Sequence, residues 1–169
     1  MSTSDILIRV LSVFFLIAIN AFFVTAEFAM VSVRRSRISQ LVKAGDIQAQ
    51  TVQSLQRSLD RLLSTTQLGI TLSSLALGWV GESVMAKLVI EVLTKSPLPR
   101  FVSISLSHSI AIPCAFLFLA YLQIVLGELC PKSLSLLYSE QLARFLGPSI
   151  RVISQIFNPF ICILNQSTR

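Results

Sequence analysis

Charge is scarce in this sequence of 169 residues. Only 13% of the residues are Asp, Glu, Lys or Arg, whereas 53% are hydrophobic and the mean hydropathy is +0.75. A soluble domain of this length needs more charge to cover its surface, so the composition excludes an ordinary soluble protein. The hydrophobic residues also come in long blocks, which is typical of membrane-spanning helices. We therefore predict a single all-α domain, residues 1–169, that is integral to the membrane.

Metal-binding and catalytic side chains are few as well. His108 is the only histidine, which excludes a histidine-based metal or catalytic cluster within the chain. Cys114, Cys130 and Cys162 are widely spaced in apolar stretches and match neither a disulfide framework nor a zinc site. No pairing of a nucleophile with a base is visible either, so we expect no enzyme activity.

The charges that are present are mostly basic, with a net charge of +6 and an isoelectric point near 9.8. In a membrane protein the usual cause is basic loops on the cytoplasmic side, which we favour over nucleic-acid binding. The first apolar block, residues 6–33, is too long for a signal peptide, and Arg34, Arg35 and Arg37 follow it directly. We predict a span that ends in the cytoplasm, an outside N-terminus and a location in the plasma (inner) membrane.

The remaining segments are predicted from their patterns. Residues 34–63 have an apolar face at helical spacing that is interrupted at Ala44-Gly45-Asp46, which indicates two short amphipathic helices on the cytoplasmic surface or a soluble helical hairpin. The second and third spans are expected at residues 68–93 and 101–129, joined by a short outside turn with Pro97 and Pro99. Residues 132–164 are expected to form juxtamembrane helices with a cytoplasmic C-terminus. A fourth span over 145–164 is the alternative, although Arg151 would be costly inside it.

Small residues form a stripe along the second span. Thr71, Ser74, Gly78 and Gly81 share one helical face. Such a stripe lets two helices approach closely, and we favour packing over the alternative, a cavity lined by hydroxyl and backbone oxygens.

Two acidic residues inside predicted spans are functional candidates, because charges at membrane depth are expensive. Glu27 shares a face with Asn20, seven residues earlier, although pairing with a basic residue at the interface would also explain it. Glu128 is the stronger candidate, because Pro131 cannot bond the carbonyl of Gly127 and the helix is expected to break there. A carboxylate beside freed carbonyls is the kind of oxygen site that holds cations such as Mg²⁺. The same pattern is also consistent with a plain helix stop, and Lys132 would then extend to the headgroups or pair with a carboxylate.

Three segments together resemble a known family. They are Asn20-Ala-Phe-Phe-Val-Thr-Ala-Glu-Phe-Ala29, Thr66-Gln-Leu-Gly-Ile-Thr-Leu-Ser-Ser-Leu75 and Gly127-Glu-Leu-Cys-Pro-Lys132. In this order they resemble the transmembrane domain of the CNNM/CorC (cyclin M, haemolysin-like) family. The resemblance implies Na⁺-coupled efflux of Mg²⁺ by a homodimer with three spans, a belt of short helices and a juxtamembrane helix. It also implies an ATP-binding pair of CBS domains and a C-terminal domain, which are absent here, so the chain is expected to be the transmembrane part alone.

The sequence matches the family's site motifs at some positions and departs from them at others. Glu128, Pro131 and Lys132 match the acidic turn that contributes to the family's Mg²⁺ site. The family's serines before Glu27 are replaced by Val24 and Ala26, and its two asparagines in the second span are replaced by Ile70 and Ser74. The candidate metal ligands are Glu128, Gly127, Ser74 and Thr71, and the further site or gating candidates are Glu27, Asn20, Thr25, Gly69, Pro131 and Lys132. Because neutral ligands are missing, a transporter of another cation or a polyamine is an alternative, and so is a membrane anchor or regulatory module that transports nothing.

Overall fold

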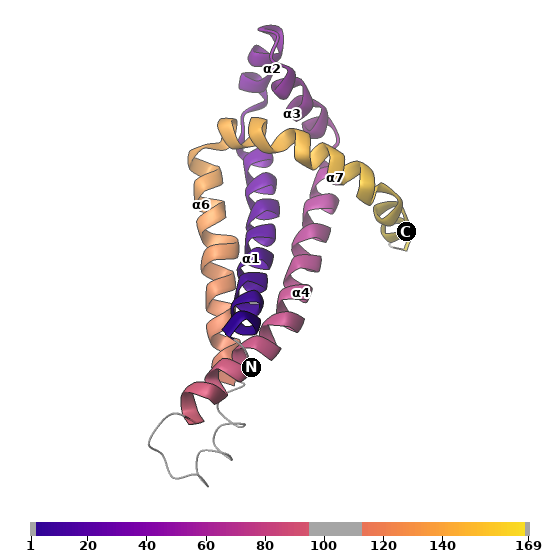
Figure 1. Ribbon diagram of the computed structural model, residues 1–169. Helices are drawn as coiled ribbons and strands as arrows, with labels where there is room; N and C mark the ends of the chain where they lie inside the picture. The colour runs from indigo at the N-terminus through magenta and orange to yellow at the C-terminus, as the bar shows by residue number, and fades with distance from the viewer. Residues whose placement is uncertain (1–2, 95–112, 168–169) are drawn as a thin grey trace.

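Three long helices run side by side in this computed structural model, which describes residues 3–94 and 113–167, with side chains over 7–81, 113–163 and at Gln166. Helix α1 (Thr3–Ser32) lies between α4 (Leu59–Thr94) and a third helical run. That run consists of residues 113–122, the π-helical segment η1 (Gln123–Leu129) and α6 (Cys130–Leu137). All the regular secondary structure in the described residues is helical (Figure 1), which confirms the predicted all-α class.

Two short helices follow α1, as the sequence pattern predicts. Helices α2 (Arg35–Lys43) and α3 (Ile47–Arg57) form a hairpin beyond the end of α1 (Figure 1). Gly45 makes the turn with a φ of 91°, a conformation that suits glycine because it lacks a Cβ. Asp46 then caps α3 by accepting a hydrogen bond from the backbone N–H of Ala49 at 3.0 Å.

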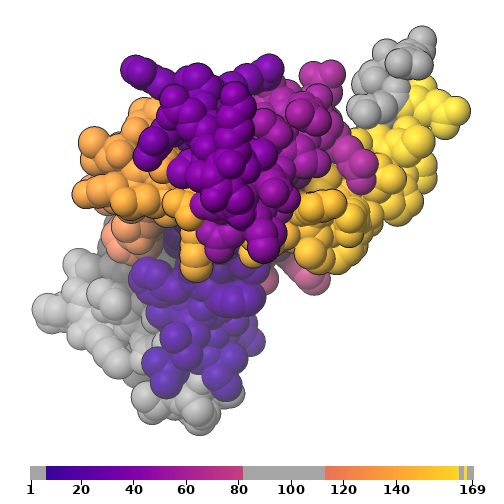
Figure 2. Space-filling model, turned by 90° about the horizontal axis from the view of Figure 1, so that it is seen from above, coloured from indigo at the N-terminus to yellow at the C-terminus, as the bar shows by residue number. Residues whose placement is uncertain are grey.

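Helix α7 (Ser139–Ser167) lies across the ends of the long helices rather than beside them (Figure 1). Seen from above, α2 and α3 cover the centre of this end and α7 extends past them to one side (Figure 2). An ion pair between Arg144 and Asp46 joins α7 to α3, and a 3.2 Å hydrogen bond from Thr65 to Ser154 joins α4 to α7. This crossed position is the one expected of a juxtamembrane helix.

Three stretches of the described residues are long and apolar enough to cross a membrane. They are Leu7–Ser32, Pro113–Leu137 and Ser139–Ile163. The last is most of α7, so its composition alone permits a span, whereas its direction in Figure 1 places it across the bundle.

Several boundaries differ from the predicted ones. Helix α4 begins at Leu59, nine residues before the predicted start of the second span at 68. The third helix continues to Leu137 instead of ending at 129, because a π-helical turn absorbs Pro131 without breaking the helix. The predicted start of the third span at residue 101 and the turn with Pro97 and Pro99 lie outside the described residues.

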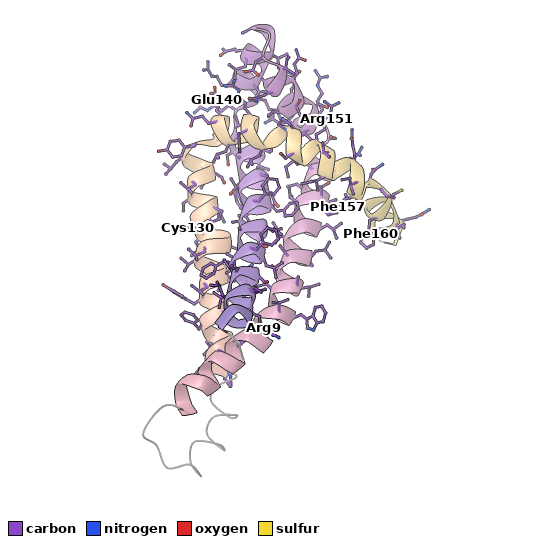
Figure 3. The ribbon with its side chains drawn as sticks, in the orientation of Figure 1. Arg9, Cys130, Glu140, Arg151, Phe157 and Phe160 are labelled. Carbon is purple, nitrogen blue, oxygen red and sulfur yellow. The ribbon has the colours of Figure 1, made fainter. Side chains whose placement is uncertain are left out.

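The long helices are apolar outside and tightly packed inside. Leu75, Trp79 and Phe116 lie on the outer surface with most of their side chains exposed. Such exposure would be unfavourable in water but is expected where lipid surrounds the helices. Charged side chains gather at the ends instead: Arg9 lies toward one end of α1, and Glu140 and Arg151 lie on α7 at the other (Figure 3). This distribution is that of a multi-pass membrane protein.

Candidate functional site

Asn20 joins three helices inside the bundle. Its side chain is fully buried, and its Nδ2 donates to the backbone carbonyl of Gly127 in η1 at 3.2 Å. Its Oδ1 accepts from the hydroxyls of Ser73 and Ser74 in α4, at 2.9 and 3.3 Å. A buried asparagine with these partners satisfies both ends of its amide, so the junction is polar and also fixed in geometry.

Gln123 completes this junction from the third helix. Its Nε2 donates to the Ser74 hydroxyl at 3.4 Å, whereas its Oε1 is buried and has no hydrogen-bond partner. An unpaired acceptor away from water is unfavourable unless a donor, a water or a cation meets it. The free oxygen at this junction is therefore a candidate cation ligand.

The π-helical turn explains how the Gly127 carbonyl becomes available to Asn20. The backbone N–H of Cys130 bonds to the carbonyl of Val125, five residues earlier, which is the π-helical spacing. Pro131 has no N–H to offer the carbonyl of Gly127, and this carbonyl accepts from the Asn20 amide instead. There is little room to spare, because a Cβ on Gly127 would lie 3.1 Å from the Asn20 Nδ2.

Glu27 forms a second level of the candidate site. It lies two turns after Asn20 on α1, about 10 Å further along the helix axis. Its Oε2 is buried without a hydrogen-bond partner. Interfacial pairing was the alternative for this residue, and no salt bridge to it is found among the described side chains.

The other predicted site residues are placed as follows. Glu128 is exposed on the third helix of the single chain and is adjacent in sequence to the buried Gly127. Lys132 places its ammonium 4.6 Å from the ring centroid of Phe28, in a cation–π contact between α6 and α1. Thr71 is exposed and donates to the carbonyl of Gln67 in its own helix at 2.8 Å.

Thr25 and Gly69 have packing roles in the described structure. The Thr25 hydroxyl donates to the carbonyl of Ala21 at 2.7 Å, and the Thr25 carbonyl accepts from the buried Ser135 at 3.2 Å. Gly69 lies against the ring of Phe23, so that α4 approaches α1 closely at this point.

The predicted stripe of small residues coincides only in part with the face of α4 that packs inward. Thr71 and Gly78 are exposed, Ser74 is half-buried, and Gly81 is buried. The face of α4 that is turned inward instead carries Thr66, Gly69, Ser73, Leu77 and Gly81. Packing, the favoured explanation of the stripe, applies at Gly81, which lies against Leu119, and not at Gly78, which has open space around it.

Two residues of the junction, Ser73 and Gln123, were not among the sequence candidates. Gln123 is a polar residue within the third span, a signal that could have identified it. Ser73 is adjacent to Ser74, and only the rotation of α4 distinguishes them. In the described residues no group of three or more His, Cys, Asp and Glu side chains is positioned to hold a metal ion.

The fold and this junction define the class: a multi-pass helical membrane protein with buried polar groups between its spans. The chain belongs to the family of the cyclin M transmembrane N-terminal domain, whose model matches residues 11–169. It is 40% identical over 154 residues to the UPF0053 protein YhdT of Bacillus subtilis. This match covers 91% of this chain and 32% of YhdT. The UPF0053 protein YugS of the same organism is 35% identical over 162 residues (96% and 37%), and the UPF0053 protein sll0260 of Synechocystis is 32% identical over 168 residues (99% and 37%).

This chain spans about a third of the length of these relatives. The greater length of the relatives is consistent with additional domains beyond the membrane part.

Proposed function

We propose that this domain moves a divalent cation, Mg²⁺, across the membrane. The observation that carries the proposal is a pair of buried acceptor oxygens without partners, Gln123 Oε1 and Glu27 Oε2, both inside the helix bundle. Both oxygens carry lone pairs that can coordinate a cation, so a bound cation would satisfy them. Family membership in the cyclin M transmembrane domain supports the same conclusion.

The chemistry of these groups suits a hard cation. Mg²⁺ prefers oxygen ligands in octahedral geometry at about 2.0–2.1 Å and usually keeps several waters. Ser74 and Gln123 supply neutral oxygens at the junction, and Glu27 supplies a carboxylate two turns away. With a single carboxylate among these groups, the ion would cross largely hydrated and be held by water-mediated contacts.

Glu128 enters this proposal through a second copy of the chain. Its carboxylate is exposed on the third helix, beside the carbonyl of Gly127 that Asn20 binds. In a homodimer packed through this helix, Glu128 would be buried near the junction and would add a charged ligand. A monomer by light scattering in mild detergent would contradict this part of the proposal.

Na⁺ is the proposed coupling ion, and efflux is the proposed direction of transport. The proposed orientation places the end of the first span in the cytoplasm. The longer relatives are consistent with regulatory domains after α7, for which an ATP-binding pair of CBS domains is the proposal. Helix α7 contacts both α1 and α3, so a domain attached to it would act directly on the end of the bundle.

The test is Mg²⁺ flux from proteoliposomes, with and without a Na⁺ gradient, for this chain and for the full-length protein. Glu27→Gln and Glu128→Gln should each reduce the flux at least tenfold, whereas Glu140→Gln, which removes a carboxylate from the surface of α7, should leave it unchanged. No flux of Mg²⁺ at either length would contradict the magnesium proposal. Flux of another divalent cation or of a polyamine in the same vesicles would then identify the alternative substrate, and no flux of any would favour an anchor.

A further inference from the structure

A pocket lined by polar and charged residues lies between α2 and α3, at the base of their hairpin. It has a volume of about 240 Å³ and is lined by Arg35, Ser39, Gln53, Gln56 and Arg57. This is several times the roughly 30 Å³ that a water molecule occupies in the liquid, so the pocket has room for a phosphate group and some water. Its lining has two guanidinium groups and no carboxylate.

The two arginines of the pocket have no acidic partner among the residues that the structure describes. Arg35 donates to the backbone carbonyl of Gln56 and Arg57 to the side chain of Gln53, both at 3.5 Å, the long limit of a hydrogen bond. Within the described residues, neither arginine forms a salt bridge. Nearby Arg37, by contrast, pairs with Glu140 at 3.0 Å. Most of the donors of Arg35 and Arg57 are therefore available to an external anion.

The wall of the pocket is held rigidly by the end of α1. Gln56 is 6% exposed, and its Nε2 donates to the carbonyls of Met30 and Val33, both at 3.1 Å. The Met30 carbonyl lies in the last turn of α1, where no intrahelical donor remains, and the Val33 carbonyl belongs to the residue that follows α1. The Gln56 side chain therefore caps the C-terminal end of α1 and holds α3 in place beside it. The pocket is thus largely preformed.

The pocket lies where a lipid headgroup is expected. Arg35 is the first residue of α2 and Arg57 the last of α3, so both lie beside the points where α1 ends and α4 begins. This is the end of the bundle across which α7 lies (Figures 1 and 2). Two guanidinium groups match the geometry of a phosphate, which accepts paired hydrogen bonds from each.

We propose that the Arg35–Arg57 pocket binds a phosphate-bearing anion, with the headgroup of an anionic lipid as its source. The site is separate from the buried junction around Asn20 and does not depend on transport. An anionic headgroup held here would fix the α2–α3 hairpin against the membrane surface.

The test is native mass spectrometry of the full chain in neutral detergent, titrated with phosphatidylglycerol, with phosphatidylcholine or with inorganic phosphate. Arg57→Gln should weaken retention of phosphatidylglycerol about tenfold, the value of one charge-assisted hydrogen bond. Lys43→Gln removes the same charge from the far end of α2 and should change retention less than about twofold, as expected for a distant exposed charge.

A second pair of variants removes the risk that lost binding reflects lost folding. Gln53→Glu places a carboxylate four residues before Arg57 on α3, a spacing that stabilises a helix while it neutralises the arginine. This variant should fold at least as well and should also bind about tenfold more weakly. Gln48→Glu adds the same charge at the other end of α3 and should bind normally.

Each outcome decides the proposal. Selective loss of phosphatidylglycerol in Arg57→Gln and Gln53→Glu supports a lipid site. The same selective loss seen with inorganic phosphate instead supports the pocket but assigns it to a soluble phosphate. Equal binding by all four variants and the unchanged chain would overturn the proposal, and it would do so whether or not the domain transports Mg²⁺.

Discussion

A methyl group added at Gly69 tests the closest approach of α4 to α1. A Cβ at this position would lie 2.5 Å from Cε1 and Cζ of the Phe23 ring, well inside van der Waals contact. The ring cannot move away freely, because Phe23 is 7% exposed and stacks edge-on against Phe22 with centroids 5.3 Å apart. Either the ring or the whole of α4 must shift to admit the methyl group.

The expected magnitude follows from two opposing effects. Overpacking of a close contact costs about 1–3 kcal/mol. Replacing a helical glycine by alanine returns up to about 1 kcal/mol through helix propensity. Gly69→Ala should therefore lower the free energy of unfolding by roughly 1–2 kcal/mol.

Gly78→Ala is the matched control on the same helix. Nothing lies within 4 Å of the added Cβ at Gly78, so only the propensity term applies and the free energy of unfolding should stay level or rise. Unfolding can be followed by circular dichroism and by the fluorescence of Trp79, the only tryptophan, during titration with sodium dodecyl sulfate in mixed micelles. Adding Phe23→Leu to Gly69→Ala should restore part of the loss. If Gly69→Ala is as stable as Gly78→Ala, the described packing of α4 on α1 is wrong.

The same titration tests two contacts of the belt helices. Arg144→Met leaves the half-buried carboxylate of Asp46 without its ion pair and should destabilise by about 1–3 kcal/mol, whereas Arg37→Met breaks an exposed pair and should cost less than about 1 kcal/mol. Equal effects would contradict the difference in burial. Gln56→Leu removes two hydrogen bonds to the end of α1 and should cost about 2 kcal/mol, against less than about 0.5 kcal/mol for the partly exposed Gln53→Leu. A stable Gln56→Leu protein would show that the end of α1 is satisfied in another way.

Local signals predict the belt region well. The interruption at Gly45 and Asp46 is decided by residues next to one another in the chain, namely a glycine in a left-handed turn and an aspartate that caps the next helix. The all-helical membrane class follows from composition and from the length of the apolar blocks. Such features need no knowledge of tertiary contacts, which is why the sequence is sufficient for them.

The third helix shows where local reasoning fails. Pro131 predicts a break, but the helix continues because the Gly127 carbonyl finds a donor in Asn20, 107 residues away in the chain. The π-helical turn that aligns them has no reliable sequence pattern. A single sequence therefore indicates that a carbonyl is freed but not which side chain meets it.

The rotation of α4 about its own axis cannot be predicted from the sequence, for a different reason. In a soluble helix the apolar face marks the inside, but in a membrane both lipid and core are apolar. Small residues on α4 occupy two faces, so their spacing alone selects Ser74 as readily as Ser73. One residue corresponds to about 100° of rotation, which is enough to exchange the half-buried Ser74 for the buried Ser73.

The most direct test of the central claim is the Mg²⁺ flux of Gln123→Met in proteoliposomes. Methionine preserves the length and flexibility of the side chain but removes the buried free oxygen, which is the proposed contact with the passing cation. The account predicts a flux at least tenfold lower, with unfolding unchanged within about 1 kcal/mol because the bond to Ser74 is long. A folded Gln123→Met protein that carries Mg²⁺ at the original rate would contradict the assignment of this junction to the cation path.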